Sequence, residues 1–74
     1  MTILFVCSGN IHRSALAAGL LSHLARRDGR SDLVVLSAGV IAVAGLPCVE
    51  EARSLARADG VDLSDHRSRP LDEV

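Results

Sequence analysis

The chain has 74 residues, of which 49% are apolar and only one, Phe5, is aromatic. A chain of this length forms at most one small domain, and its core has to come from aliphatic side chains and alanine. The formal net charge is −1 and the basic residues are scattered, which argues against a nucleic-acid partner and against binding to an anionic membrane surface.

The first element that the sequence predicts is a buried strand over residues 3–6, an uninterrupted apolar run with β-branched and aromatic side chains. Small polar residues at 7–10 then indicate a loop. From Ser14 onward leucines recur at helical spacing among alanines, until cations and Gly29 end the pattern. We expect a helix of about three to four turns there.

Residues 33–36 form a second short apolar run, and the small residues at 37–39 are expected to end this second buried strand. Residues 40–46 are apolar without a clear period. Pro47 occupies the position of a first-turn proline in a second helix, which we expect to contain Cys48 and to stop at Gly60. The residues that follow are too few for another complete strand.

The order strand, helix, strand, helix predicts an α/β protein with a parallel β-α-β-α arrangement. Parallel strands are normally buried on both faces and flanked by neighbours, so a sheet of two strands is incomplete by itself. We therefore expect residues 1–74 to be part of a larger domain or to be completed by a partner. The open edge of the first strand invites self-association.

Two cysteines, Cys7 and Cys48, are too few for the disulfide framework of a small secreted domain. The apolar start of the chain is too short for a membrane span or a secretory signal. We expect a soluble, cytoplasmic protein with reduced thiols.

The loop between the first strand and the first helix contains a cysteine and an arginine, Cys7 and Arg13, separated by five residues. Such a loop can point its backbone N–H groups inward, and with the helix N-terminus it makes a cradle for a tetrahedral oxyanion. A thiolate at Cys7 would be the nucleophile, Ser14 could donate a hydrogen bond to it, and Arg13 could hold two phosphate oxygens. On the residues alone, a buried and inert cysteine remains an alternative.

The segment Cys7-Ser8-Gly9-Asn10-Ile11-His12-Arg13-Ser14 resembles the signature of low-molecular-weight protein-tyrosine-phosphatases. In that family cysteine, glycine, asparagine, arginine and serine hold these relative positions, and a proline usually follows. The resemblance continues through residues 37–39 and 60–69. It implies the N-terminal half of a doubly wound, flavodoxin-like phosphatase fold, with residues 1–74 as an incomplete phosphotyrosine phosphatase domain.

The resemblance also implies roles for individual residues. Cys7 matches the nucleophile that forms a phosphocysteine intermediate, Arg13 matches the phosphate-binding arginine, and Ser14 matches the hydroxyl that stabilises the thiolate. The other loop residues implied to bind phosphate or support the loop are Ser8, Gly9, Asn10, Ile11 and His12.

A hydrogen-bond network that supports the loop is implied for Asn10, Ser37 and His66. From the residues alone, Asn10 and Ser37 would be ordinary turn residues and His66 an exposed loop histidine. Two positions depart from the family pattern. His12 stands where many members have a second cysteine, so a protective disulfide with the nucleophile is not expected. Ala15 replaces the usual proline, for which we expect a modest effect.

The implied activity is hydrolysis of a phosphotyrosine protein or a small aryl phosphate, without a cofactor or metal. The histidines His12, His23 and His66 lack a convincing ligand spacing with the cysteines. The family's general acid, an aspartate, lies further downstream, so we expect this chain alone to be a crippled enzyme, because general acid catalysis is typically worth about 10²–10⁴-fold. Two alternatives stay open: a thioredoxin-coupled arsenate reductase of the same fold, and a noncatalytic anion-binding fragment.

Overall fold

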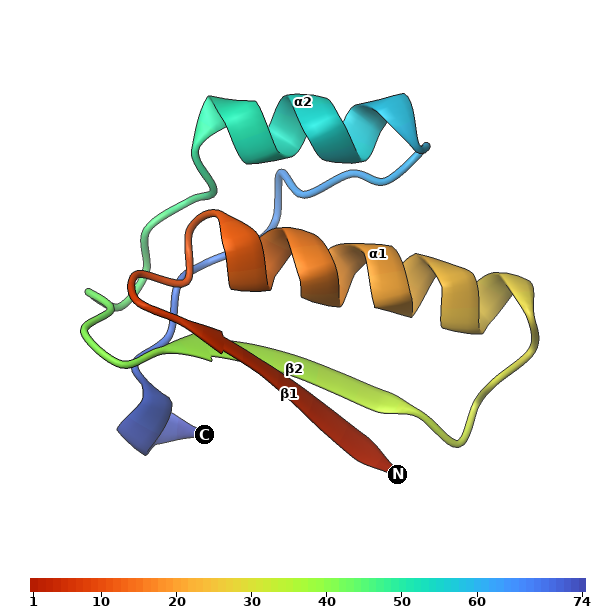
Figure 1. Ribbon diagram of the computed structural model, residues 1–74, viewed down its shortest axis with the longest axis horizontal. Coiled ribbons are helices and arrows are strands. Elements are labelled where there is room, and N and C mark those ends of the chain that lie inside the picture. Colours follow the sequence, from red (N-terminus) through yellow and green to blue (C-terminus); the bar gives the residue numbers. More distant parts are fainter.

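The computed structural model describes residues 1–74 as two strands and two α-helices (Figure 1). Their order is β1 (Thr2–Cys7), α1 (Arg13–Arg27), β2 (Val34–Gly39) and α2 (Glu50–Ala58), followed by a short 3-10 helix, η1 (Leu71–Glu73). β1 and β2 pair in parallel, and α1 provides the crossover that parallel strands require. The predicted α/β class and β-α-β-α order are confirmed. Neither helix is both long enough and apolar enough to cross a membrane.

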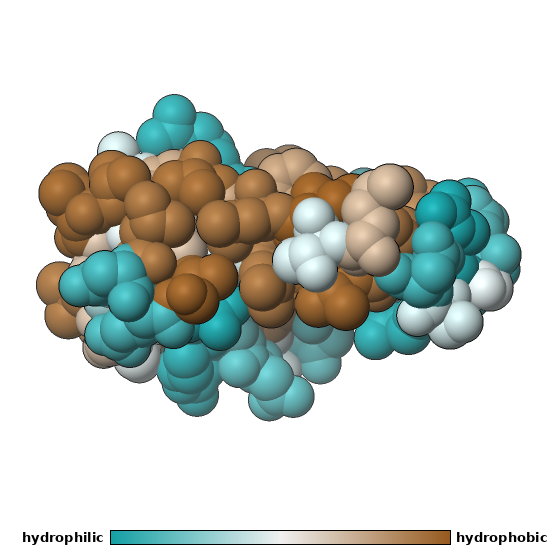
Figure 2. All heavy atoms as spheres, turned by 90° about the horizontal axis from the view of Figure 1, so that it is seen from below, coloured by the Kyte–Doolittle hydropathy of each residue, from teal (hydrophilic) through white to brown (hydrophobic).

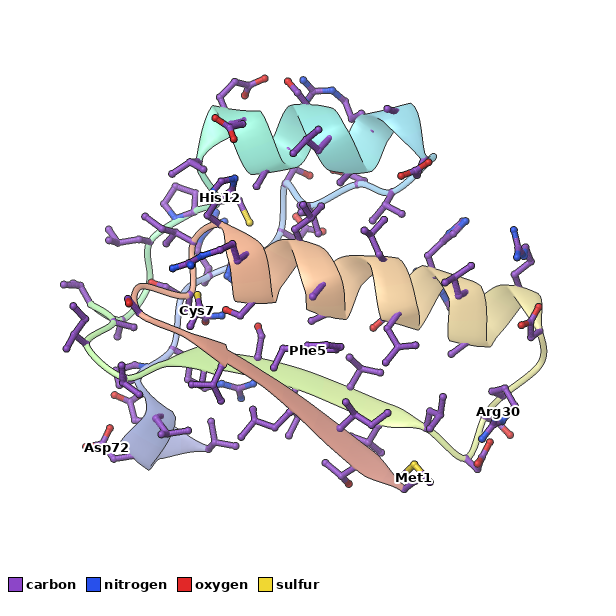
Figure 3. All side chains as sticks on the ribbon, viewed as in Figure 1. Met1, Phe5, Cys7, His12, Arg30 and Asp72 are labelled. Atoms are coloured by element: carbon purple, nitrogen blue, oxygen red, sulfur yellow. The ribbon has the colours of Figure 1, made fainter.

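Both helices lie on the same side of the sheet (Figure 1). Successive strand residues point to opposite faces, and β1 follows this rule: Phe5 is half-buried between the sheet and α1 (Figure 3), whereas Leu4 and Val6 are exposed. The expectation of a buried strand was therefore wrong for one face of β1. Nothing in this chain covers most of the second face of the sheet, so the side chains on it remain in solvent.

The face of the molecule that lies away from the helices is largely apolar (Figure 2). Its strands contribute the exposed side chains of Leu4, Val6 and Val34, and the C-terminal segment contributes Leu71. Isolated exposed apolar residues are ordinary, but a contiguous apolar face is not typical of a soluble monomer.

The hydrophobic core lies between α1, α2 and the segment after α2. Most of its buried members have small side chains, and the full set is Ala15, Cys48, Ala52, Ala56, Val61 and Leu63. Gly19 of α1 faces Leu63 so closely that a Cβ at Gly19 would lie 2.5 Å from the Leu63 Cδ2 atom. Small residues on both helices therefore bring the helix axes close to each other and to the returning chain.

Two predicted boundaries were wrong. β2 continues through residues 37–39, because these residues pair with 5–7 of β1 in register. α2 begins at Glu50, so Pro47 precedes the helix and Cys48 is buried outside it. The reason is tertiary: the N–H of Val49 donates to the carbonyl of Ile11 at 2.9 Å, which holds the backbone extended up to the helix start. The predicted stops at Gly29 and Gly60 are confirmed by their positive φ angles of 71° and 76°.

Candidate active site

The loop between β1 and α1 brings two hydrogen-bond donors to the sulfur of Cys7. The Sγ atom lies 3.0 Å from the hydroxyl oxygen of Ser14 and 3.3 Å from the backbone nitrogen of Asn10. Cys7 is the last residue of β1, and Ser14 lies in the first turn of α1, so the strand end and the helix start meet at the sulfur (Figure 3). A thiolate at this position would accept both hydrogen bonds.

The two cysteines of the chain have opposite pKa shifts. Burial raises the pKa of the Cys7 thiol, but hydrogen bonds from the Ser14 side chain and from the backbone of Ser14, Asn10 and Gly9 outweigh that effect, so the pKa is lowered overall. At Cys48 burial raises the pKa, and the charge of Arg53 opposes it only in part. The thiolate is the reactive form of cysteine, so Cys7 is the candidate nucleophile and Cys48 is not.

Asn10 holds the loop together from inside. It is fully buried, with a left-handed φ of 58° that non-glycine residues rarely adopt. Its Nδ2 donates to the Ser14 hydroxyl at 2.9 Å, and its Oδ1 accepts the backbone N–H of Arg69 at 2.8 Å. The Nε2 of His66 donates to the Asn10 carbonyl at 2.7 Å. Since the Ser14 oxygen accepts from Asn10, its own proton is available to Cys7.

The end of β2 supports the loop from outside. The N–H groups of Val40 and Ile41 donate to the carbonyls of Cys7 and Ser8, each at 3.0 Å. Gly39 lies so close to the loop that a Cβ there would be 2.5 Å from the Ser8 carbonyl oxygen and 2.9 Å from the Asn10 nitrogen. Any side chain at residue 39 would therefore displace the backbone that surrounds the sulfur.

Arg13 faces an open hollow of about 550 Å³ that it shares with Cys7, Ser8 and Ser14. Its side chain makes no hydrogen bond or ion pair inside the chain, so the guanidinium is free to bind an anion with its planar fork. The remaining residues that line the hollow are apolar, and they are Phe5, Val6, Ala17 and Val40. No carboxylate is among the lining residues.

Three of the predicted site residues occupy less direct positions. His12 lies at the start of α1 (Figure 3), where its Nε2 is 3.3 Å from a carboxylate oxygen of Glu51. Ile11 contributes its carbonyl to the start of α2. Ser37 is buried within β2; its carbonyl accepts from the guanidinium of Arg69 at 3.3 Å, and its hydroxyl makes no hydrogen bond to the loop. The structure thus brings Asn10, Ser14 and His66 together around Cys7 and leaves the Ser37 hydroxyl outside that network.

Sequence reasoning assigned no role to three residues near the loop, namely Gly39, Ser68 and Arg69. Gly39 allows the close approach of β2, and the backbone of Arg69 binds both the Asn10 side chain and the Gly39 N–H. Ser68 is buried beside them. All three lie in segments that carry the family resemblance, and that was the only signal for them in the sequence.

The chain is similar to known proteins in both sequence and fold. The sequence model of the family described as "Low molecular weight phosphotyrosine protein phosphatase" matches residues 2–74. A curated relative from Ralstonia solanacearum, the "Probable low molecular weight protein-tyrosine-phosphatase EpsP", is 40% identical over 70 residues, which cover 95% of this chain and 45% of that protein. The chain therefore spans less than half the length of this relative.

Two solved structures are similar over nearly the whole chain. The low molecular weight protein tyrosine phosphatase from T. tengcongensis has a TM-score of 0.91 and 40% identity, covering 99% of this chain and 50% of that one. The drosophila arginine phosphatase DARP has a TM-score of 0.85 and 32% identity, covering 96% and 45%. The matched fold is consistent with half of a flavodoxin-like domain. With the family match across residues 2–74, these likenesses show that the chain belongs to the low molecular weight phosphotyrosine protein phosphatase family.

Proposed function

We propose that this chain carries the nucleophile and the phosphate cradle of a phosphotyrosine phosphatase, which works through a phosphocysteine intermediate at Cys7. The observation that carries the proposal is the sulfur of Cys7, which receives hydrogen bonds from Asn10 and Ser14 at the base of a hollow that contains the unpaired side chain of Arg13. A nucleophile with a lowered pKa beside a free phosphate-binding fork fits transfer of a phosphoryl group.

The reaction follows from the positions of these groups. A phosphate monoester enters the hollow, and Arg13 binds two of its equatorial oxygens while the loop N–H groups and the N-terminus of α1 stabilise the remaining charge. The Cys7 thiolate attacks phosphorus, the bond from phosphorus to the ester oxygen breaks, and the leaving group departs with the electron pair. Water then attacks the phosphocysteine, the phosphorus–sulfur bond breaks, and inorganic phosphate and the thiolate are released.

The apolar wall of the hollow favours an aromatic leaving group. Phe5, Ala17 and Val40 can pack against a phenyl ring, whereas no lining carboxylate is available to pair with the guanidinium of a phosphoarginine. Arsenate reduction by a cysteine relay would need a second reactive thiol, and within residues 1–74 the other thiol, that of Cys48, is buried with a raised pKa. Phosphotyrosine is therefore the preferred substrate, with phosphoarginine as the comparison to be tested.

The lining of the hollow offers no group to protonate a leaving tyrosine oxygen. We therefore propose that the chain alone turns over ordinary aryl phosphates slowly. Its rate should be lower by about 10²–10⁴-fold than the rate with a general acid, which is the factor that general acid catalysis supplies. A nitrophenyl phosphate, whose phenolate leaves without a proton, should be much less affected. A phosphotyrosine peptide and a phosphoarginine peptide, assayed beside it, would separate the two substrate classes.

The decisive experiment measures the rate at which iodoacetate alkylates Cys7 as a function of pH, with and without inorganic phosphate. We expect the alkylation midpoint to lie below the ordinary thiol value of about 8.5, and phosphate to protect the sulfur. Arg13→Lys keeps the positive charge but lacks the planar fork, so it should abolish most of the protection and keep the low midpoint. An ordinary midpoint without phosphate protection would contradict the proposal.

A further inference from the structure

Ser68 holds one segment of the chain through both its backbone and its side chain. The residue is buried, its hydroxyl donates to the carbonyl of Val43, and the same oxygen accepts the N–H of Leu46 at 2.9 Å. Its backbone N–H donates to the Leu46 carbonyl at 2.7 Å, and its carbonyl accepts the N–H of Gly45 at 2.9 Å. Four hydrogen bonds from one residue thus hold residues 43–46.

The chain just before this segment is attached to the loop between β1 and α1, residues 7–14, called here the phosphate loop. The N–H groups of Val40 and Ile41 donate to the carbonyls of Cys7 and Ser8. Val40 also lines the hollow that contains Cys7, although its side chain is 60% exposed. Residues 40–46, called here the wall segment, are therefore held at one end by the phosphate loop and at the other by Ser68.

The Ser68 hydroxyl is separate from the groups that hold the sulfur. Cys7 receives its hydrogen bonds from Asn10 and Ser14, and Asn10 is held by His66 and by the backbone of Arg69. None of these bonds involves the Ser68 side chain. Loss of the hydroxyl should therefore loosen the wall segment without disturbing the phosphate cradle.

We infer that Ser68 is a positioning residue whose hydroxyl holds the wall segment against the group that carries the phosphate, and that it thereby sets the preference for an aryl phosphate over free phosphate. This inference rests on the proposed function of the hollow. Its consequence is that the affinity for the phosphate group and the affinity for the attached ring depend on different residues, the first on the loop around Cys7 and the second on the clamp at Ser68.

The test compares two ligands in one assay. Inorganic phosphate probes the cradle alone, and phenylphosphonate adds a ring in the place of the leaving group. Their dissociation constants are obtained from protection of Cys7 against iodoacetate. In Ser68→Ala the preference for phenylphosphonate over phosphate should fall roughly 3- to 10-fold, the effect expected from loss of the hydroxyl's hydrogen bonds, with the dissociation constant for phosphate unchanged.

Three further variants separate positioning from general destabilisation. Ser68→Thr keeps the hydroxyl and should restore the preference. Ser54→Ala removes a hydroxyl that contacts Glu50 on the exposed face of α2, so it should change neither constant. Gly39→Ala should weaken both ligands, because the added Cβ collides with the Ser8 carbonyl and the Asn10 nitrogen.

The outcomes distinguish the inference from the function on which it rests. Equal weakening of both ligands in Ser68→Ala, or no change in either, would overturn the role of Ser68 while the proposed function stands. Absence of phosphate protection in the unmodified chain would overturn both. If Ser68→Ala does not fold, hydrogen exchange of the Leu46 amide in the unmodified chain is measured instead. Phenylphosphonate should slow this exchange and phosphate should not. An equal effect of the two ligands on the exchange rate would overturn the inference.

Discussion

Asn10 joins three parts of the molecule that are distant in the sequence. Its side chain bonds Ser14 at the start of α1 and the backbone of Arg69 near the C-terminus, and its carbonyl accepts from His66. It does so with a left-handed backbone, which costs most residues roughly 1–2 kcal/mol. Such strain persists only where the surrounding contacts maintain it, and here these contacts orient the hydroxyl that faces Cys7.

Replacing this residue should therefore affect both stability and the nucleophile. Asn10→Ala keeps the strained φ and leaves the buried N–H of Arg69 without its partner, so we expect the free energy of unfolding in urea to fall by about 2–4 kcal/mol. The pKa of Cys7 should rise, because Ser14 is no longer oriented toward the sulfur. Asn10→Gly is the matched control: glycine accepts the positive φ, so it should recover about 1 kcal/mol of stability but leave the pKa of Cys7 raised. Equal stabilities of the two variants would contradict the role of backbone strain.

The lowered pKa of Cys7 also makes stability depend on pH. Its pKa is lower in the folded chain than in the unfolded chain, so between the two values the unfolded chain binds more protons and the free energy of unfolding rises with pH. The contribution is complete above the unfolded value of about 8.5 and is lost as the pH falls through the folded pKa. We expect the stability difference between the unmodified chain and Cys7→Ser to grow with pH over this interval in urea titrations. A difference that is constant with pH would count against a stabilised thiolate.

Local spacing was enough to predict some site residues and not others. Cys7, Arg13 and Ser14 were identified because a strand, a loop and a helix start follow one another within a few residues. Ser68 bonds backbone groups of residues 43–46, and Gly39 lies close to the backbone of Ser8, so both act on parts of the chain more than 20 residues away in sequence. No local pattern encodes a contact of that kind, since it depends on how the whole chain returns to the sheet.

The packing of α1 against α2 depends on small side chains. Ala15 and Gly19 face the second helix and the returning chain, and Ala52 and Ala56 are completely buried on the opposite side. Such an interface allows close approach, but it leaves no room for larger residues.

Enlarging one of these alanines should separate the helices. Ala52→Leu should lower the free energy of unfolding by about 1–3 kcal/mol, because the added atoms have no space at a fully buried position. The same change in the last residue of α2, Ala58→Leu, is an exposed control and should have little effect. Urea unfolding followed by circular dichroism measures both variants, and equal losses would indicate that the interface is not tightly packed.

At the scale of elements, the order of strands and helices was predictable and the surroundings of each element were not. Apolar runs of four residues indicate strands, but they do not reveal that only one face of β1 would be covered. The predicted helix start at Pro47 was wrong because the hydrogen bond between Val49 and Ile11 keeps the chain extended up to the start of α2 at Glu50. Tertiary hydrogen bonds decided these boundaries.

As a whole, the molecule has a sheet that the helices cover on one side only. The opposite side is called here the bare face. Both helices lie on one side of the sheet, and the opposite side is largely apolar (Figures 1 and 2). β1 pairs only with β2, so its other edge has unpaired backbone groups. Both features favour association with another protein surface, and the predicted self-association through this edge stays a prediction.

A charged residue on the bare face should oppose association. Leu4 is 38% exposed on the face of β1 that points away from α1, so Leu4→Lys should shift the sedimentation equilibrium toward the monomer. Leu55→Lys makes the same change at an exposed position on α2 and should leave the equilibrium as it is in the unmodified chain. An unmodified chain that stays monomeric at high concentration would contradict the prediction.

Because the two cysteines differ in burial, their reactions with a thiol reagent report on different properties of the folded chain. Cys7 is open to reagent in the folded state, whereas Cys48 is 4% exposed inside the core between the helices. A thiol reagent can reach Cys48 only during transient opening of that core, so its slow labelling in native buffer reports the opening free energy, in the way that amide exchange does for backbone groups. One time course of mass spectra would thus give two labelling rates from the same molecule. The fast rate, at Cys7, reports the reactivity of the site, and the slow rate, at Cys48, reports transient opening of the core.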